Sequence, residues 1–265
     1  MKQDDIQYIR SKNGFIIDMD GVLYHGNKLL PGVRDFVKWL KDEQKKFVFL
    51  TNSSERTPRE LKEKLQRLGI DVDTSVFYTS ALATAMFLAS QKPKGSAFII
   101  GEAGLINALY NVGYTMNNVD PDFVVMGETR TYSYEKIEHA VNLVLNGAKL
   151  VGTNPDLTGP IETGIAPATK SLIAPIELST GRNAYFVGKP NPLMMRNALK
   201  KIKCAREESI IIGDRMDTDM VAGIESEIDT CLVLSGITNL EIMAEFAYQP
   251  KFVLDGVGDI VGIRS

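Results

Sequence analysis

The stretch Phe15-Ile16-Ile17-Asp18-Met19-Asp20-Gly21 joins a short apolar run to two carboxylates and a glycine. Alternate side chains of a strand point the same way, so Asp18 and Asp20 are expected to face one site at the strand's C-terminal end. Carboxylates this close raise each other's proton affinity unless a cation lies between them. Such an oxygen-rich site suits Mg²⁺. The same residues would also fit a strand that ends in an Asp-Gly turn.

Apolar runs of similar length recur along the chain and predict further buried strands. With the first, they cover residues 15–17, 47–50, 97–100, 123–126, 150–152, 185–187, 210–212 and 231–234. Stripes of apolar residues with helical spacing lie between them. Strands that alternate with helices predict an α/β fold with a mainly parallel sheet.

Three of the predicted helices have clear boundary signals. Thr57, Pro58 and Glu60 form a capping box with proline in the first turn. Asn191 before Pro192 likewise marks the start of a helix. Gly147 follows the apolar stripe of residues 137–145 and marks the end of that helix.

The composition limits the function classes. The chain has 265 residues, a net charge of -3 and no basic excess, which argues against nucleic-acid binding. No apolar stretch is long enough to span a membrane, and residues 1–14 lack a secretory signal. The two cysteines have no metal-binding or redox spacing, which fits a reducing compartment. We therefore expect a cytoplasmic protein of one large or two modest domains.

Four of the predicted strands end in polar clusters. These are Asp18 with Asp20, residues 51–54 (Thr-Asn-Ser-Ser), residues 188–190 (Gly-Lys-Pro), and Asp214 with Asp217 and Asp219. Each cluster alone has an ordinary explanation as a turn, a cap or a solvated surface. Ligands of open α/β sheets bind outside the carboxyl ends of the strands. If the four strands are neighbours, one crevice would hold a metal and a phosphate.

Taken together, the four clusters resemble the motifs of the haloacid dehalogenase superfamily of phosphohydrolases. Residues 76–80 (Val-Phe-Tyr-Thr-Ser), 127–130 (Gly-Glu-Thr-Arg) and 153–156 (Thr-Asn-Pro-Asp) further resemble its NagD-like, p-nitrophenyl phosphatase branch. The resemblance implies a doubly wound, Rossmann-like parallel-sheet core formed by residues 1–80 and 185–265. It also implies an inserted α/β cap domain over residues 81–184.

The resemblance also implies a role for each motif residue. Asp18 would be the nucleophile, Asp20 the general acid and base, and Lys189 a neutralising charge. Thr51 and Asn52, with Lys189, would bind phosphate. Asp18, Asp214 and the backbone carbonyl of Asp20 would hold Mg²⁺, with Asp219 ordering a metal-bound water instead of touching the metal. Asp217 has no implied role and is interpreted as a helix N-terminal acid.

These observations predict a Mg²⁺-dependent phosphomonoesterase that forms an aspartyl-phosphate, with nucleoside monophosphates as the expected substrates. The alternatives are a sugar-phosphate phosphatase, a phosphotransferase with an acceptor other than water, and a non-catalytic binding module. The partner would be a small phosphorylated metabolite, with no nucleic acid and no membrane. The sequence is compatible with a homo-oligomer but does not require one.

Within the cap, residues 154–164 predict a specificity loop, because long connections after strands often carry binding residues. Asn154 and Asp156 fit equally well as substrate contacts and as turn caps. Glu128 and Arg130 are expected to form an ion pair.

Overall fold

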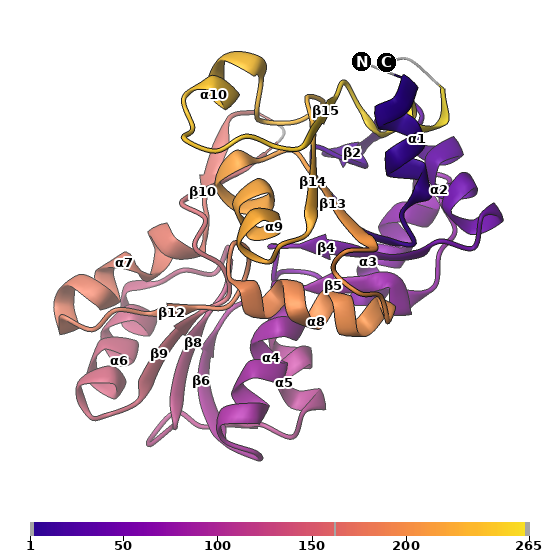
Figure 1. Ribbon diagram of the computed structural model, residues 1–265. Coiled ribbons are helices and arrows are strands. Elements are labelled where there is room, and N and C mark those ends of the chain that lie inside the picture. The colour runs from indigo at the N-terminus through magenta and orange to yellow at the C-terminus, as the bar shows by residue number, and fades with distance from the viewer. Residues whose placement is uncertain (1–2, 162, 263–265) are drawn as a thin grey trace. The chain divides into compact units, whose positions relative to one another are not determined.

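The computed structural model describes residues 3–161 and 163–262 (Figure 1). The chain forms two compact units, the first built from Met1–Thr51, Lys62–Tyr78 and Lys189–Ser265, and the second from Asn52–Leu61 and Thr79–Gly188. These bounds differ from the expected domains in three places. Residues 52–61, 79–80 and 185–188 belong to the second unit, not to the first.

The first unit is built on a six-stranded sheet, in which β15, β14, β13, β1 and β4 run parallel. In spatial order its strands are β15 (Phe252–Leu254), β14 (Asp229–Val233), β13 (Ser209–Gly213), β1 (Gly14–Asp18), β4 (Lys46–Thr51) and β5 (Phe77–Thr79). Strands β1 and β13 are buried along their whole length, as their apolar runs predicted. The prediction of an α/β fold with a parallel sheet is confirmed.

Helices cover both faces of this sheet. α8 (Pro192–Ile202) and α9 (Val221–Glu225) lie on one face, whereas α1 (Gln3–Ser11) and α2 (Val33–Asp42) lie on the other (Figure 1). The apolar residues Val33, Phe36, Val37 and Leu40 of α2 are buried, and Asn191 caps α8 through its side chain. The unit also contains β2 (Tyr24–His25), β3 (Lys28–Leu29), α10 (Leu240–Ala244), η1 (Thr74–Val76), η2 (Met216–Met220) and η3 (Val257–Val261).

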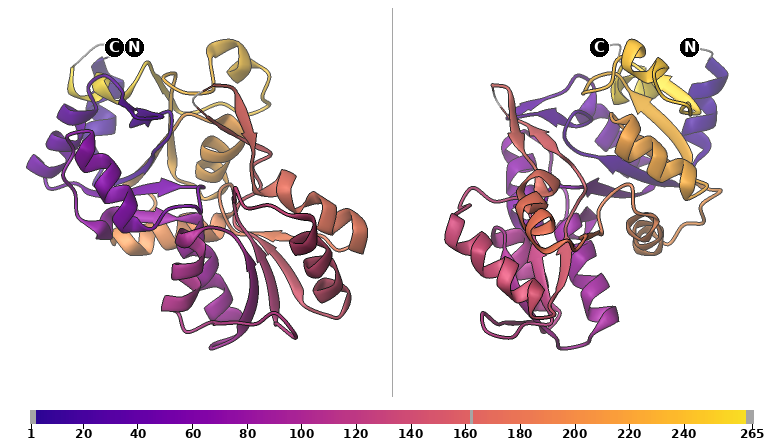
Figure 2. Two further views of the ribbon diagram at one scale, coloured as in Figure 1. Left: turned by 180° about the vertical axis from the view of Figure 1, so that it is seen from behind. Right: turned by 90° about the vertical axis from the view of Figure 1, so that its left-hand side faces the viewer.

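The second unit has its own five-stranded parallel sheet. Its order is β12 (Tyr185–Phe186), β9 (Lys149–Gly152), β8 (Phe123–Met126), β6 (Ser96–Ile100) and β7 (Thr115–Met116). Figures 1 and 2 show α4 (Ser80–Gln91) and α5 (Ala103–Asn111) on one side of the sheet and α6 (Tyr134–Leu145) and α7 (Thr169–Thr180) on the other. A hairpin of β10 (Thr158–Pro160) and β11 (Ile165–Pro167) extends the unit.

One expectation about the strands is wrong. The four strands that end in polar clusters do not share a sheet, because β12 pairs with β9 in the second unit. In β12, Tyr185 pairs with Val151 of β9 and Phe186 pairs with Gly152. A short apolar run can indicate a strand, but it does not indicate which sheet that strand joins.

Helix α3 (Pro58–Arg67) begins where the capping box predicted. The Thr57 hydroxyl accepts from the Glu60 backbone N–H at 3.3 Å, and the Glu60 carboxylate accepts from the Thr57 N–H at 2.7 Å. The Thr57 N–H and the Thr57 hydroxyl both donate to the Glu60 carboxylate, and these two hydrogen bonds lower the pKa of Glu60. Both residues lie in the second unit. In the described part of the chain, 3–161 and 163–262, no helix is both long and apolar enough to cross a membrane.

Replacing Thr57 with alanine removes the hydroxyl that caps α3. We expect Thr57→Ala to lower the free energy of unfolding by about 1 kcal/mol, because the N–H of Glu60 loses its acceptor. Urea denaturation followed by circular dichroism measures the change. Thr57→Ser, which keeps the hydroxyl, is the matched control and should stay close to the wild type. Equal losses in both variants would contradict the capping role.

Candidate active site

Three neighbouring strands of the first sheet bring motif residues to one edge. Asp18 is the last residue of β1, Thr51 is the last of β4, and Asp214 directly follows β13. The register pairs Asp18 with Leu50 on one side of β1 and Ile17 with Ile212 on the other. The carboxyl ends of the three strands therefore meet, as expected for a ligand site of a parallel sheet.

Lys189 lies among these carboxylates although it follows a strand of the other unit. Its ammonium donates to Asp18 Oδ1 at 2.5 Å and to Asp219 Oδ1 at 2.6 Å. Lys189 and Asp219 are almost completely buried, and Asp18 is 9% exposed. Burial opposes the charge of Lys189, but the two carboxylates outweigh it and raise the pKa of the ammonium. The lysine is therefore held as a cation.

Asp18 and Asp214 at this edge resist ionisation. Burial is the main cause that raises the pKa of Asp214 to about 7, and the nearby charge of Asp219 adds to it. Burial likewise raises the pKa of Asp18 well above its ordinary value, with Lys189 opposing the shift. One ammonium faces three carboxyl groups, so the cluster would carry more negative charge than Lys189 can balance if all three ionised.

The same three carboxylates meet the requirements of a metal site. Asp18, Asp214 and Asp219 each offer an oxygen, and these oxygens lie within 4.8 Å of one another. Both Asp219 oxygens already accept hydrogen bonds, from Lys189 and from the Arg215 backbone N–H at 3.2 Å. A divalent cation would balance the excess charge, and hard carboxylate oxygens suit Mg²⁺.

Backbone packing around Asp214 leaves no room for other side chains. A Cβ at Gly21 or Gly236 would collide with the Asp214 carboxyl group, and Gly21 also has a positive φ of 80°. Asp214 Oδ2 accepts from the Ile237 backbone N–H at 2.8 Å. The sequence analysis missed Gly236 and Ile237, since nothing in their local pattern marks a contact with a residue more than 20 positions away.

Asp20 lies two residues beyond Asp18 and is more exposed. Its carboxylate accepts from the Tyr24 hydroxyl at 3.3 Å, and its side chain is half-buried where Asp18 is buried. Tyr24 is itself buried, with the Lys64 ammonium 3.5 Å from its ring centroid. An acid that exchanges protons with a leaving group or water needs such partial access.

Asn52 lies in the second unit, although it directly follows Thr51. Its side-chain amide donates to Asp156 Oδ2 at 2.8 Å, and the Asn154 amide donates to the same oxygen at 2.6 Å. Asn154 is completely buried and Asp156 nearly so. Asn154 and Asp156, which fitted a substrate contact and a turn cap equally well, form a buried polar network with Asn52.

Glu128 forms the other end of this network. Its carboxylate accepts from the Ser54 backbone N–H at 3.1 Å and from the Asn154 amide at 3.2 Å, while the Glu128 N–H donates to Ser54 Oγ at 3.1 Å. Burial raises the pKa of Glu128 to about 7. The expected ion pair with Arg130 is absent among the described residues: both Glu128 carboxylate oxygens accept from Ser54 and Asn154, and the charge of Arg130 acts on Glu102. Sequence spacing could not reveal that Glu128 is buried against residue 54.

One further expectation needs adjustment. Asp217 is not simply a helix N-terminal acid, because it forms a two-point ion pair with Arg215 at 3.0 and 2.7 Å at the start of the π-helical turn η2.

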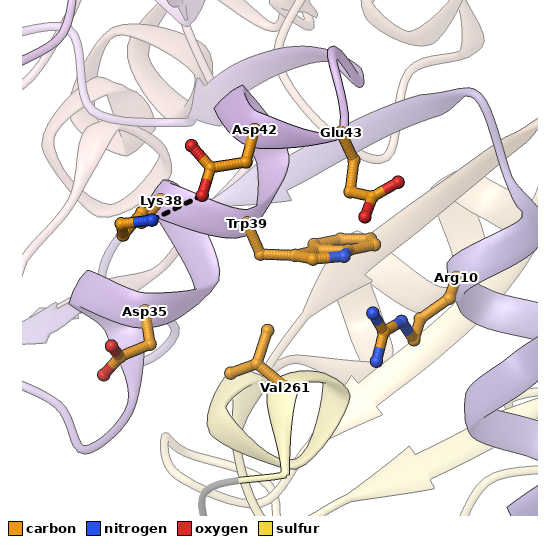
Figure 3. Close-up of a pocket in the computed structure, with 7 residues that line it drawn as sticks. All are labelled: Arg10, Asp35, Lys38, Trp39, Asp42, Glu43 and Val261. Carbon is orange, nitrogen blue, oxygen red and sulfur yellow. Dashed lines mark hydrogen bonds and ion pairs between the residues drawn. The ribbon is translucent and has the colours of Figure 1, made fainter.

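A separate pocket of about 240 Å³ in the first unit is lined by Arg10, Asp35, Lys38, Trp39, Asp42, Glu43 and Val261 (Figure 3). It contains none of the motif residues.

Two family models match the chain. One, described as haloacid dehalogenase-like hydrolase, covers residues 15–115, and a second of the same superfamily covers residues 186–260. A dihydroxyacetone phosphatase of Corynebacterium glutamicum is 45% identical over 93% of this chain and 90% of its own length. The chain belongs to the haloacid dehalogenase-like hydrolase family.

Other relatives place it among the NagD-like phosphatases of that family, as the motifs predicted. The ribonucleotide monophosphatase NagD of Escherichia coli is 41% identical over 92% of this chain and 96% of its own. The solved NagD structure matches with a TM-score of 0.89, covering 94% of this chain and 98% of the other at 40% identity. A 4-nitrophenylphosphatase from Thermotoga maritima gives a TM-score of 0.91 at 34% identity, covering 95% and 97%. The predicted enzyme class, phosphoric monoester hydrolase, and the Rossmann-like fold are confirmed.

The shifted pKa of Glu128 predicts a pH-dependent stability. With a folded pKa of about 7 against an ordinary value of 4.5, the folded state keeps a proton that the unfolded state loses. This contribution to stability is complete below pH 4.5 and disappears as the pH rises through 7. Glu128→Gln lacks the titration. We expect its free energy of unfolding, relative to the wild type, to improve by roughly 1 to 3 kcal/mol between pH 5 and 8.

Denaturant unfolding of both proteins at a series of pH values measures this difference. Glu138→Gln, at an exposed position of α6, is the matched control and should give a constant difference. A constant difference for Glu128→Gln as well would contradict the raised pKa.

Proposed function

We propose that the protein is a Mg²⁺-dependent phosphomonoesterase of small phosphorylated metabolites, with the first unit as its catalytic core and the second as its cap. The observation that carries the proposal is the buried cluster of Asp18, Lys189, Asp214 and Asp219 at the carboxyl edge of the first sheet. This collection of charges suits a phosphoryl group and a cation, because phosphoryl transfer depends mostly on positioning and charge stabilisation.

The reaction would proceed in two displacements. A carboxylate oxygen of Asp18 attacks phosphorus while the bond from phosphorus to the leaving oxygen breaks, and Asp20 gives its proton to that oxygen. Asp20 then removes a proton from water, the water oxygen bonds to phosphorus, and the bond to Asp18 breaks. Phosphate is released, and both carboxyl groups return to their starting states.

Other residues hold the reacting groups. Lys189, held as a cation beside Asp18, offsets negative charge on the nucleophile and the phosphoryl group. Thr51 and Asn52 supply donors to the phosphate oxygens. Asp18, Asp214 and the backbone carbonyl of Asp20 would hold Mg²⁺, which supplies charge stabilisation when bound. Asp219 orients Lys189 and orders water at the metal.

The activities for which the relatives are named support two candidate substrate classes. We favour nucleoside monophosphates, since NagD and a 5'-nucleotidase of Bacillus subtilis match the chain over nearly its whole length. Triose and sugar phosphates are the second candidate, supported by the 45% identity with a dihydroxyacetone phosphatase. Transfer to an acceptor other than water shares the first displacement. A phosphatase of such metabolites would work in the cytoplasm.

Removing the nucleophile tests the chemistry. Asp18→Asn keeps the size of the side chain but cannot form the acyl phosphate, so we expect phosphate release to fall roughly a thousandfold or more. Initial rates with p-nitrophenyl phosphate, with circular dichroism to verify folding, provide the measurement. Asp35→Asn, at an exposed position of α2, should retain full activity. Normal turnover by Asp18→Asn would exclude Asp18 as the nucleophile.

Metal removal and a substrate panel test the cofactor and the substrate class. We expect EDTA to abolish phosphate release, and Mg²⁺ to restore it and to raise the thermal unfolding midpoint of the wild type. Asp214→Asn should lose the thermal effect of Mg²⁺, because one of the converging carboxylates is gone. Nucleoside monophosphates should be the best substrates in a panel with dihydroxyacetone phosphate, sugar phosphates and p-nitrophenyl phosphate. Unchanged activity in EDTA would contradict the metal requirement.

A further inference from the structure

The side chain of Asn52 is fixed at both ends by residues of its own unit. Its Nδ2 donates to Asp156 at 2.8 Å. Its Oδ1 lies against the backbone at Gly188, where an added Cβ would be only 2.7 Å away. The Gly188 N–H donates to the Thr153 carbonyl at 2.7 Å, which holds that backbone in place. Asn52 therefore has a carboxylate on one side and closely packed main chain on the other.

Asp156 is itself held firmly. Its Oδ2 also accepts from the buried Asn154 amide at 2.6 Å. Asn154 Oδ1 in turn accepts from the Thr153 hydroxyl at 3.1 Å, and that hydroxyl lies 3.1 Å from the Thr169 hydroxyl. Asn154, Thr153 and Thr169 are completely buried. A carboxylate anchored by such a chain can hold a partner in one orientation.

Holding one N–H of a carboxamide sets the direction of the other. The two donors of an asparagine amide lie in one plane, and the torsion that turns this plane is soft in asparagine. The hydrogen bond to Asp156 removes that freedom. Asn52 follows Thr51 directly in the chain, so a fixed Asn52 side chain also constrains the loop next to the phosphate-binding hydroxyl.

We propose that Asp156 is a positioning residue of the phosphatase reaction, which orients Asn52 toward the phosphate without touching the substrate. This inference rests on the proposed function, since it assigns phosphate binding to Asn52. It makes Asp156, on the second unit, part of the machinery that the four motifs of the family do not include. A purely structural Asp156 would stabilise the second unit and act independently of Asn52.

A double-mutant cycle separates these two roles. The variants are Asn52→Ala, Asp156→Ala and the double replacement, with kcat/KM for p-nitrophenyl phosphate and the inhibition constant of orthophosphate as readouts. We expect each single replacement to lower kcat/KM about 10- to 100-fold and to weaken orthophosphate inhibition. The kcat/KM of the double variant should lie within about threefold of that of the less active single variant, because both changes remove the same oriented donor.

Conservative replacement gives a second readout that does not depend on Asp156→Ala folding. Asp156→Asn keeps an acceptor oxygen for both amides, so we expect it to retain kcat/KM within about fivefold of the wild type. It should have no further effect in the Asn52→Ala background. Asp120→Asn, an exposed aspartate of the same unit, is the matched control and should leave both readouts unchanged.

The outcomes are distinct. An active wild type with non-additive losses supports the positioning role. The inference is overturned if the wild type is active and the losses of kcat/KM at positions 52 and 156 multiply in the double variants, with alanine or asparagine at position 156. The proposed function then still stands. A folded wild type that releases no phosphate from any ester and shows no orthophosphate binding by calorimetry overturns the proposed function and this inference with it.

Discussion

The buried ammonium of Lys189, held between Asp18 and Asp219, is the interaction on which the site depends. Removing three carboxyl groups from water is costly, and their mutual repulsion adds to that cost. Burial is the main cause that raises the pKa values of Asp18 and Asp214, the nearby charge of Asp219 adds to it, and Lys189 offsets only part of the shift. Structural cores seldom retain such an arrangement, whereas a centre that receives a cation and a phosphoryl group requires it.

The second unit has a buried polar network of its own. Asp156 and Glu128 are linked through Asn154, and their other hydrogen bonds go to residues 52 and 54. The chain passes from one unit to the other directly after Thr51 and directly after Gly188. Both passages lie next to motif residues, so a change in the network acts on the segment that carries the second motif. The chain itself therefore links the two units directly beside residues of the motifs.

Much of the fold could be predicted because its signals are local. Buried strands such as β1 and β13 are unbroken apolar runs, and α3 begins at a capping box that its hydrogen bonds reproduce. The motif residues Asp18, Thr51 and Asp214 could be placed at strand ends because each directly follows an apolar run. Short or polar strands such as β7 and β10 gave no such signal, since two or three residues are too few to establish a period.

The sequence by itself determined the alternation of strands and helices, the four polar clusters and the family, because each depends on neighbouring residues. Only the tertiary structure decided that β12 joins the second sheet, that Glu128 contacts Ser54, and that Asp156 holds Asn52. These contacts join residues from about 30 to more than 100 positions apart, and they exist because burial forces polar groups to find partners. Local patterns record which groups a chain contains, whereas packing decides which of them meet.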